Sequence, residues 1–338
     1  MISRREFIAS TALAALQDGP PLRLGMLGMW HSHAPGIVSR VAENPKEFEL
    51  VGFYDPDPAV VADRSKAWAS KLPVKVFEKP EQLLAEKLDG VVVESRVYEN
   101  LALAKLALES GRSVMLEKPA GTNLEEHRAL IALARQKKLH VQMIYLFRYL
   151  PAVREMLSRK GELGALYEFR GRLAKDLPGY ARNVAECGRY KGGIFFEMGG
   201  HAIDLMVALL GAPKRVGPFL AHHSTNEPTS FIDHGITVFS YERAWGVVEV
   251  PALEVVPRQR RFELYGTKGA VVIPHLPEPK IEVCAAGGKW TSIDLPAVPG
   301  QLADLREFAA VVGGRKAPEF PMDHDLAVQE ALLQACGM

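Results

Sequence analysis

Short apolar runs alternate with segments of helical length through the first half of the chain. The first run, 22–27, is mostly apolar and ends at Gly28, which is typical of a strand buried in a parallel sheet. The segment that follows, 34–43, can form a helix. Further strands are expected at 48–54, 74–77, 90–93, 113–117 and 140–145, and further helices at 58–71, 98–110 and 122–138. Strands that alternate with helices predict a parallel, doubly wound sheet.

Two of these helices carry signals at their ends. Gly111 directly follows the helix at 98–110 and can adopt the left-handed backbone with which many helices end. Thr122 and Glu125 have the spacing of a capping box, in which each side chain accepts a hydrogen bond from the backbone N–H of the other residue. We therefore expect Thr122 to cap the helix at 122–138.

The pattern changes after Pro151. Strands are expected with little helix between them, at 166–173, 235–241, 245–250 and 261–265, and a turn at 266–269. One helix is expected at 201–210, where Gly211 stops it, and another at 301–312. Consecutive strands of this kind predict an open, largely antiparallel sheet. The fold class is therefore α/β, with a doubly wound domain at 20–148 and an α+β domain at 149–338.

The first 19 residues are left out of this fold argument. The paired arginines of Ser3-Arg4-Arg5-Glu6-Phe7-Ile8 precede a short, mildly apolar run of small residues, 9–16. This order is typical of a twin-arginine export signal, which carries folded proteins to the periplasm. The alternative is an N-terminal tail in which two arginines are adjacent by chance, and the protein would then be cytoplasmic.

Composition excludes several classes of protein. The net charge of the 338-residue chain is +1 without a basic run, so no nucleic-acid partner is expected. The three cysteines lie far apart, which excludes a disulfide framework and a cysteine-rich zinc site. No uninterrupted apolar stretch reaches the roughly 18 residues that span a bilayer, so no membrane partner is expected either.

The first strand-to-helix turn has features of a dinucleotide site. Glycines there let the backbone approach a diphosphate, and the helix N-terminus supplies unpaired N–H groups. Counted from Gly28, however, the second and third glycine positions of the usual fingerprint hold Trp30 and His33, and a plain tight turn would explain the pattern equally. Asp55 follows the second strand, and its spacing from Gly28 is close to that expected for a carboxylate that binds the adenosine ribose. The dipeptide Asp55-Pro56 could also simply start a turn.

Together the turn and Asp55 predict a Rossmann domain that binds a nicotinamide dinucleotide. Because a carboxylate repels a 2′-phosphate, NAD is favoured, with NADP possible. The residues assigned to cofactor binding are Gly25, Gly28, Met29, Trp30, His31, Asp55, Ser95, Glu117 and Lys118.

Two further segments resemble the signatures of the glucose–fructose oxidoreductase/inositol dehydrogenase (Gfo/Idh/MocA) family. The tripeptide Glu117-Lys118-Pro119 ends a predicted strand, and the glycine-led stretch 192–204 contains Glu197, His201 and Asp204 at the family's spacing. The resemblance covers essentially the whole chain after Gly19. The chain differs from the family at positions that bind cofactor or substrate. The differences are Trp30 for a glycine, Ser95-Arg96 for Thr-Pro, Asn100 for histidine and Glu197 for aspartate.

The resemblance implies three catalytic residues. Lys118 matches the family's active-site lysine, and Glu197 and His201 match its Asp–His pair. Four residues apart, the latter two can share a helical face, where the carboxylate would make the imidazole a better base. Residues assigned to the substrate are Arg148, Tyr180 and Asp204.

The pair His31 and His33 admits a second interpretation as metal ligands, with His222, His223 or His234 completing the set. Nothing in the sequence forces these histidines to converge. We therefore expect no metal site and assign the pair to the phosphates of the cofactor.

The resemblance implies an NAD(P)-dependent oxidoreductase that acts on a sugar, a cyclitol or a related polyol. Two alternatives stay open. One is a glycoside-cleaving enzyme that oxidises its substrate transiently, and the other is a non-catalytic nucleotide-binding protein. The expected partners are a carbohydrate-like small molecule and further copies of the chain, which would associate through the open sheet.

Overall fold

The computed structural model describes residues 19–69, 71–72, 75–176, 181–225, 231–254, 259–298 and 300–338. The proposed export segment and Tyr180 lie outside these ranges. The chain forms two compact units. The first unit comprises the described residues up to Ile144 together with a later segment that ends at Leu326. The second unit comprises Tyr145–Val298 and Ala327–Met338. The domain boundary predicted from the sequence lay at 148, and the return of the chain to the first unit was not predicted.

The first unit is built on a six-stranded parallel sheet with the order β3-β2-β1-β4-β5-β6. The order reverses between β1 and β4, and doubly wound sheets bind their ligands at the carboxyl ends of the strands at such a switch point. The predicted parallel sheet is confirmed. The strands are β1 (Leu22–Leu27), β2 (Phe48–Tyr54), β3 (Lys75–Val76), β4 (Gly90–Val93), β5 (Ser113–Glu117) and β6 (Val141–Ile144).

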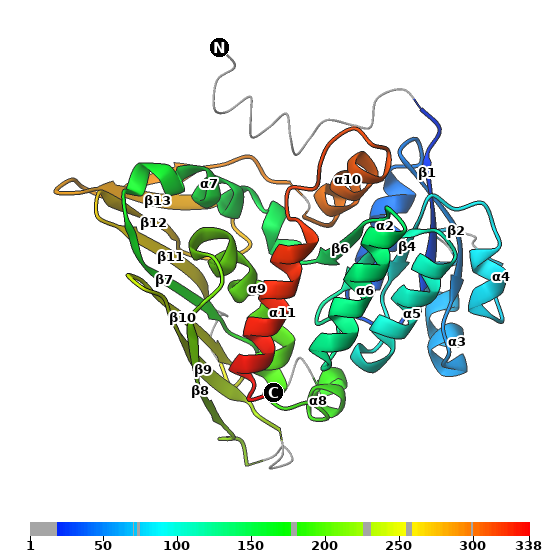
Figure 1. Cartoon of the computed structure of the whole chain (residues 1–338), viewed down its shortest axis with the longest axis horizontal. Coiled ribbons are helices and arrows are strands. Elements are labelled where there is room, and N and C mark those ends of the chain that lie inside the picture. The colour runs from blue at the N-terminus through cyan, green and yellow to red at the C-terminus, as the bar shows by residue number, and fades with distance from the viewer. Residues whose placement is uncertain are drawn as a thin grey trace. The chain divides into compact units, whose positions relative to one another are not determined.

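Helices connect these strands, and two of them, α5 and α6, lie side by side across the sheet (Figure 1). α10 packs against α2, which accounts for the return of the chain to this unit. The helices are α2 (Ala34–Glu43), α3 (Pro58–Trp68), α4 (Pro80–Leu84), α5 (Val97–Glu109), α6 (Leu124–Gln136) and α10 (Gly300–Val312).

The predicted cap of α6 is wrong. Asn123, not Thr122, is the N-cap residue, and its side-chain oxygen accepts from the N–H groups of Glu125 and Glu126 at 3.0 and 3.3 Å. Its short amide side chain satisfies two N–H groups that the first helical turn leaves open.

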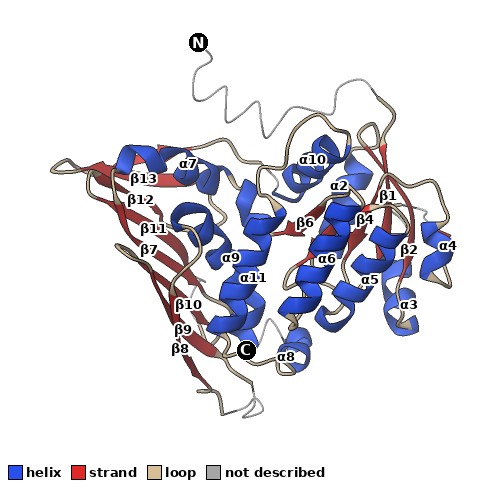
Figure 2. Cartoon of the chain, viewed as in Figure 1, coloured by secondary structure: helices blue, strands red, loops and turns tan. Residues whose placement is uncertain are grey.

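The second unit is built on an eight-stranded sheet with the order β14-β13-β12-β11-β7-β10-β9-β8. Only the pair β7 and β10 is parallel among the neighbouring strands of this sheet, so the prediction of a largely antiparallel sheet is confirmed. Figure 2 shows the strands as one layer with α7 and α9 packed against them. The strands are β7 (Leu166–Leu173), β8 (Arg215–Ala221), β9 (His234–Ser240), β10 (Trp245–Pro251), β11 (Arg260–Gly266), β12 (Gly269–Ile273), β13 (Lys280–Ala285) and β14 (Thr291–Asp294).

The main helix of this unit, α9 (Gly193–Leu210), begins eight residues before the predicted start at 201. Glycines at 193, 199 and 200 lower the intrinsic helix propensity of this segment, but its burial against the sheet outweighs that cost. A Cβ at Gly171 of β7 would lie 2.9 Å from the Cβ of Ala202, so the helix approaches the strand closely. The remaining helices are η1 (Leu146–Tyr149), α7 (Pro151–Arg159), η2 (Lys160–Leu163), α8 (Ala181–Cys187) and α11 (Met322–Ala335).

By length and composition α9 could cross a membrane, since it has 18 residues and few charges. In this fold 89% of it is buried, as in the core helix of a globular unit.

Candidate functional site

The turn after β1 touches the end of β4 at the switch point of the sheet. Gly28 has a positive φ of 85°, and its N–H donates to the carbonyl of Tyr54 at 2.7 Å. A Cβ at this position would lie 2.5 Å from the Cβ of Ser95. Both the backbone conformation and the contact therefore require glycine.

Asp55 ties this turn to the end of β2. Its buried carboxylate accepts from the N–H of Met29 at 2.6 Å and from the N–H of Asp57 at 2.9 Å. Burial raises the pKa of Asp55, and the two backbone hydrogen bonds oppose that rise. The carboxylate lies where the sequence predicted the ribose-binding acid, and in addition it orders the turn.

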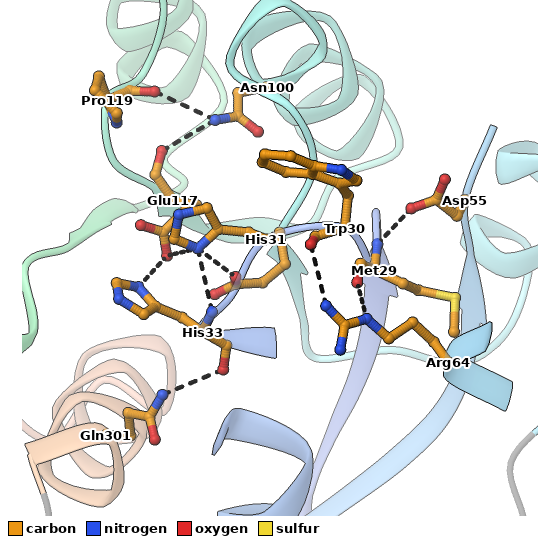
Figure 3. A network of polar contacts seen from close by, with 11 residues as sticks. Met29, Trp30, His31, His33, Asp55, Arg64, Asn100, Glu117, Pro119 and Gln301 are labelled. Atoms are coloured by element: carbon orange, nitrogen blue, oxygen red, sulfur yellow. Dashed lines mark hydrogen bonds and ion pairs between the residues drawn. The ribbon is translucent and has the colours of Figure 1, made fainter. Parts of the chain in front are cut away.

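Two arginines flank the turn, and Figure 3 shows one of them, Arg64, beside Met29 and Trp30. Arg64 donates to the carbonyls of Met29 and Trp30 at 3.1 and 3.2 Å. Arg96 pairs with Asp57 at 2.8 Å, and its guanidinium lies 5.4 Å from the centre of the Trp30 ring. The indole at the second fingerprint position is thus held against Arg96 by a cation–π contact.

The turn retains the donors that a diphosphate needs. No residue of the described ranges accepts a hydrogen bond from the N–H of Trp30 or Ser32, and both groups precede α2 by a few residues. Unpaired N–H groups at a helix N-terminus bind phosphate oxygens. The residues present therefore fit a dinucleotide, whose phosphates the N–H groups of Trp30 and Ser32 would hold and whose ribose Asp55 would bind. Gly25 lies inside β1 instead, where a Cβ would meet Leu88, so its small size serves packing of the sheet.

Two histidines of the turn meet two glutamates at the ends of β4 and β5, and Figure 3 shows His31 and His33 beside one of them, Glu117. The Nδ1 atom of His31 lies 3.4 Å from Glu94 and 3.5 Å from Glu117. The Nδ1 atom of His33 lies 3.0 Å from the same carboxylate oxygen of Glu117. The parallel register pairs Val93 with Leu116, which places the two glutamates next to one another.

The charges of this cluster depend on one another. Burial and the neighbouring Glu117 raise the pKa of Glu94 to about 8. Burial opposes ionisation of Glu117 as well, but His31, His33 and Lys118 together outweigh it and lower its pKa. Burial lowers the pKa of His33 despite the attraction of Glu117. Glu94 is therefore the more readily protonated of the two carboxylates.

Lys118 follows β5 and is 2% exposed. The buried amide of Asn100 donates to the carbonyl of Glu117 at 3.3 Å and to the carbonyl of Pro119 at 3.2 Å. The backbone is therefore held on both sides of Lys118, and the peptide bond between Lys118 and Pro119 is cis. The side chain of Asn100 therefore fixes the backbone around the lysine.

Glu197 and His201 lie one turn apart on α9, and both are buried. The ring of His201 stacks on Phe147 with 4.6 Å between the centroids and meets the edge of Tyr145 at 5.9 Å. These aromatic contacts fix the plane of the imidazole.

Arg148 and Asp204 form a buried pair, with the Nε of Arg148 at 2.9 Å and its outer nitrogen at 2.6 Å from the carboxylate. The guanidinium also lies 4.8 Å from the centre of the Tyr145 ring. The pair joins η1 to α9. If Arg148 or Asp204 binds substrate, it does so while it also forms this structural contact. Their assignment to the substrate stays a prediction.

Most of the residues assigned to the cofactor gather at one edge of the first unit's sheet. Lys118 belongs to the first unit and Glu197 and His201 to the second, so their convergence on one substrate stays a prediction. Glu94 is a site residue that was not predicted, although the sequence contains a signal for it. Glu94 and Glu117 each close an apolar run, and such residues meet when the two strands are neighbours in a parallel sheet.

The other histidines considered as metal ligands belong to the second unit and have partners of their own there. The Nδ1 atom of His222 lies 2.7 Å from the carbonyl of Phe231, and the rings of His223 and His234 meet edge to face at 5.7 Å.

Two family profiles match the chain. One, described as "Oxidoreductase family, NAD-binding Rossmann fold", matches residues 22–145, and the other, described as "GFO/IDH/MocA C-terminal domain", matches residues 151–272. The scyllo-inositol 2-dehydrogenase (NAD(+)) of Bacillus subtilis is 25% identical over 316 residues, which cover 88% of this chain and 86% of that protein.

Solved structures show the same fold. The UDP-N-acetylglucosamine 3-dehydrogenase GnnA from Acidithiobacillus ferrooxidans matches with a TM-score of 0.79 at 19% identity, over 94% of this chain and 97% of that chain. GenD2 from gentamicin A biosynthesis, solved in complex with NAD, matches with a TM-score of 0.77 at 19% identity, over 95% of both chains.

Proposed function

The chain belongs to the Gfo/Idh/MocA family of oxidoreductases and has the family's NAD-binding Rossmann domain, and on that premise we propose that it transfers a hydride between NAD and an alcohol carbon of a sugar, a cyclitol or a related polyol. The observation that carries this proposal is the buried Lys118 at the carboxyl end of β5, with its backbone held by Asn100. The names of the inositol and UDP-sugar dehydrogenases among its relatives support the substrate class.

Oxidation of an alcohol removes a hydride from carbon and a proton from oxygen. Bound NAD⁺ supplies the acceptor for the hydride. In the proposed reaction His201 takes the hydroxyl proton, and Glu197, one turn away on α9, raises the basicity of its imidazole. The ammonium group of Lys118 stabilises the negative charge that builds on the oxygen.

The experiment that tests this function follows NADH formation at 340 nm with a panel of polyols and nucleotide sugars. His201→Ala should lower kcat by about 10²-fold or more, the usual effect of losing a general base. Lys118→Ala should lower kcat by about 10²-fold or more as well, because the charge on the oxygen would lose its stabilising partner. His275→Ala, which removes a partly exposed histidine of the second unit, serves as the control and should keep full activity. Full activity in both active-site variants would contradict the assignment. Cleavage of a glycoside without net NADH would indicate the redox-neutral alternative.

We further propose that two copies associate through the open face of the eight-stranded sheet. Phe219, Ile236 and Trp245 are 69%, 37% and 56% exposed. Phe219 of β8 pairs with Ile236 of β9, and Trp245 of β10 pairs with Ser240 of β9. Ser240 lies two pleats after Ile236, so both side chains point to the same face of the sheet. Phe219, Ile236 and Trp245 therefore share this face. Exposed apolar groups on one face are typical of an interaction surface.

Light scattering on the eluting protein tests the association. Trp245→Glu should shift a dimer toward the monomer, whereas Tyr98→Glu, at an equally exposed aromatic residue of α5, should not. A monomeric wild type would contradict this proposal.

A further inference from the structure

Four side chains of the kinds that bind transition metals converge at the switch point of the Rossmann sheet. His31 and His33 come from the turn after β1, Glu94 follows β4, and Glu117 ends β5. All four belong to the first unit. One ligand atom from each of His31, His33 and Glu117 lies within 4.8 Å of the other two.

Three of the separations between these atoms are close to those around a small cation, and Glu94 lies beside His31, outside the group of three whose atoms are all close to one another. The Nδ1 atom of His31 lies 3.4 Å from Glu94 and 3.5 Å from Glu117, and the Nδ1 atom of His33 lies 3.0 Å from Glu117. Ligands that surround Zn²⁺ tetrahedrally at about 2.0–2.1 Å are about 3.3 Å apart. Little movement of the side chains would therefore be needed to admit an ion between them.

The glutamates have oxygen atoms that the rest of the fold leaves open. Glu94 and Glu117 are both fully buried. Within the described ranges, neither carboxylate oxygen of Glu94 has a hydrogen-bond partner, nor does the Oε1 atom of Glu117. Two neighbouring buried carboxylates whose oxygens are not all hydrogen-bonded are costly unless a proton or a cation balances their charge.

We propose that His31, His33 and Glu117, with Glu94 beside His31, form a binding site for a divalent first-row transition-metal ion such as Zn²⁺. Imidazole nitrogen together with carboxylate oxygen suits these ions, whereas Mg²⁺ and Ca²⁺ take oxygen ligands. Binding replaces the contact in which the Nδ1 of His31 accepts from the N–H of His33, and at 3.3 Å this contact is long for such a bond.

The ion would balance both carboxylates and join the turn after β1 to the ends of β4 and β5. It would thereby hold the backbone that faces the cofactor's phosphates. All residues of this site belong to the first unit, and the proposal does not depend on which alcohol the enzyme oxidises.

The test uses the full chain, freed of metal by dialysis against a chelator and titrated with ZnCl₂ by calorimetry. The wild type should bind one Zn²⁺ per chain, and binding should raise its melting temperature. His31→Ala and His33→Ala should each weaken binding by at least about tenfold, since even partners outside the ligand set cost that much. Glu94→Gln keeps the shape of the side chain, and it provides the same test if an alanine variant does not fold.

The control His275→Ala removes a histidine of the second unit and should bind Zn²⁺ like the wild type. A wild type that takes up no Zn²⁺ would show that protons alone balance the two carboxylates, and the proposal would be wrong. Affinity unchanged in His31→Ala, His33→Ala and Glu94→Gln would overturn it equally, because the ion would then bind elsewhere.

Discussion

The side-chain amide of Asn100 donates to the main-chain carbonyl of Glu117 at 3.3 Å, across two neighbouring elements of the Rossmann domain. The same amide donates to the carbonyl of Pro119 at 3.2 Å, so that the two hydrogen bonds enclose Lys118. Such a contact acts on the lysine through its backbone, and from it we infer that Asn100 is a positioning residue.

Replacement of Asn100 by alanine should therefore affect both stability and turnover. Two buried carbonyls would lose their donor, at about 1–3 kcal/mol each in the free energy of unfolding. We expect kcat to fall with little change in NAD affinity, measured by steady-state kinetics and calorimetry. Asn44→Ala is the control, because it removes a side-chain hydrogen bond to the partly exposed carbonyl of Arg40 at 2.7 Å. Equal effects of the two substitutions on kcat would contradict a positioning role.

Replacement of Gly28 by alanine separates backbone strain from contact. Both Gly28 and Gly111 have positive φ, 85° and 82°, but a Cβ at Gly28 would lie 2.5 Å from Ser95 while a Cβ at Gly111 would meet nothing within 4 Å. Gly111→Ala should cost about 1–2 kcal/mol from strain alone. Gly28→Ala should cost more and also weaken NAD binding, because the turn would have to move away from Ser95. Chemical denaturation and calorimetry measure the two effects. NAD affinity that is unchanged in Gly28→Ala would disprove the role of this turn.

Asp55 should make the enzyme prefer NAD over NADP. Its carboxylate lies at the end of β2 and would repel a 2′-phosphate on the adenosine ribose. Calorimetry should show tighter binding of NADH than of NADPH, and Asp55→Asn should narrow the difference while it keeps an acceptor for the N–H of Met29. NADPH binding as tight as NADH binding in the wild type would refute this assignment.

The buried His127 should make the free energy of unfolding depend on pH. Burial on α6 lowers its pKa from 6.5 to about 4, so between these pH values the unfolded chain binds a proton that the folded chain does not. The free energy of unfolding should therefore fall as the pH falls from about 6.5 to about 4, by up to about 3 kcal/mol from this residue. Urea unfolding at pH 7.5 and 5.0 measures the loss. His127→Leu should reduce it, and the same loss in the variant would show that other groups are responsible.

Export remains a proposal based on the arginine pair. Replacement of Arg4 and Arg5 by lysine should keep the protein in the cytoplasm, because the twin-arginine route requires both arginines. Fractionation followed by immunoblotting measures the distribution. If the wild type and the variant are retained equally, the segment is a tail without a targeting role.

The sequence by itself determined the class of fold and the local elements of the nucleotide domain. The observed bounds of β1, β2, β4 and β5 are those predicted, because each is an apolar run with clear turn residues at its ends. The positions of Gly28, Asp55 and Lys118 at the carboxyl ends of strands followed from the same pattern. Local sequence suffices where burial and turn conformation both depend on neighbouring residues.

The tertiary structure decided what depends on residues far apart in the chain. The start of α9 at Gly193 reflects its burial against the sheet, which outweighs the low helix propensity of its glycines. The hydrogen bonds of Asn100 and the pair of Arg148 with Asp204 likewise join separate elements. The His31–Glu94–Glu117 cluster arises only because β1, β4 and β5 are neighbours in the sheet. Such contacts leave no periodic pattern in the sequence, because chain packing rather than local conformation brings the partners together.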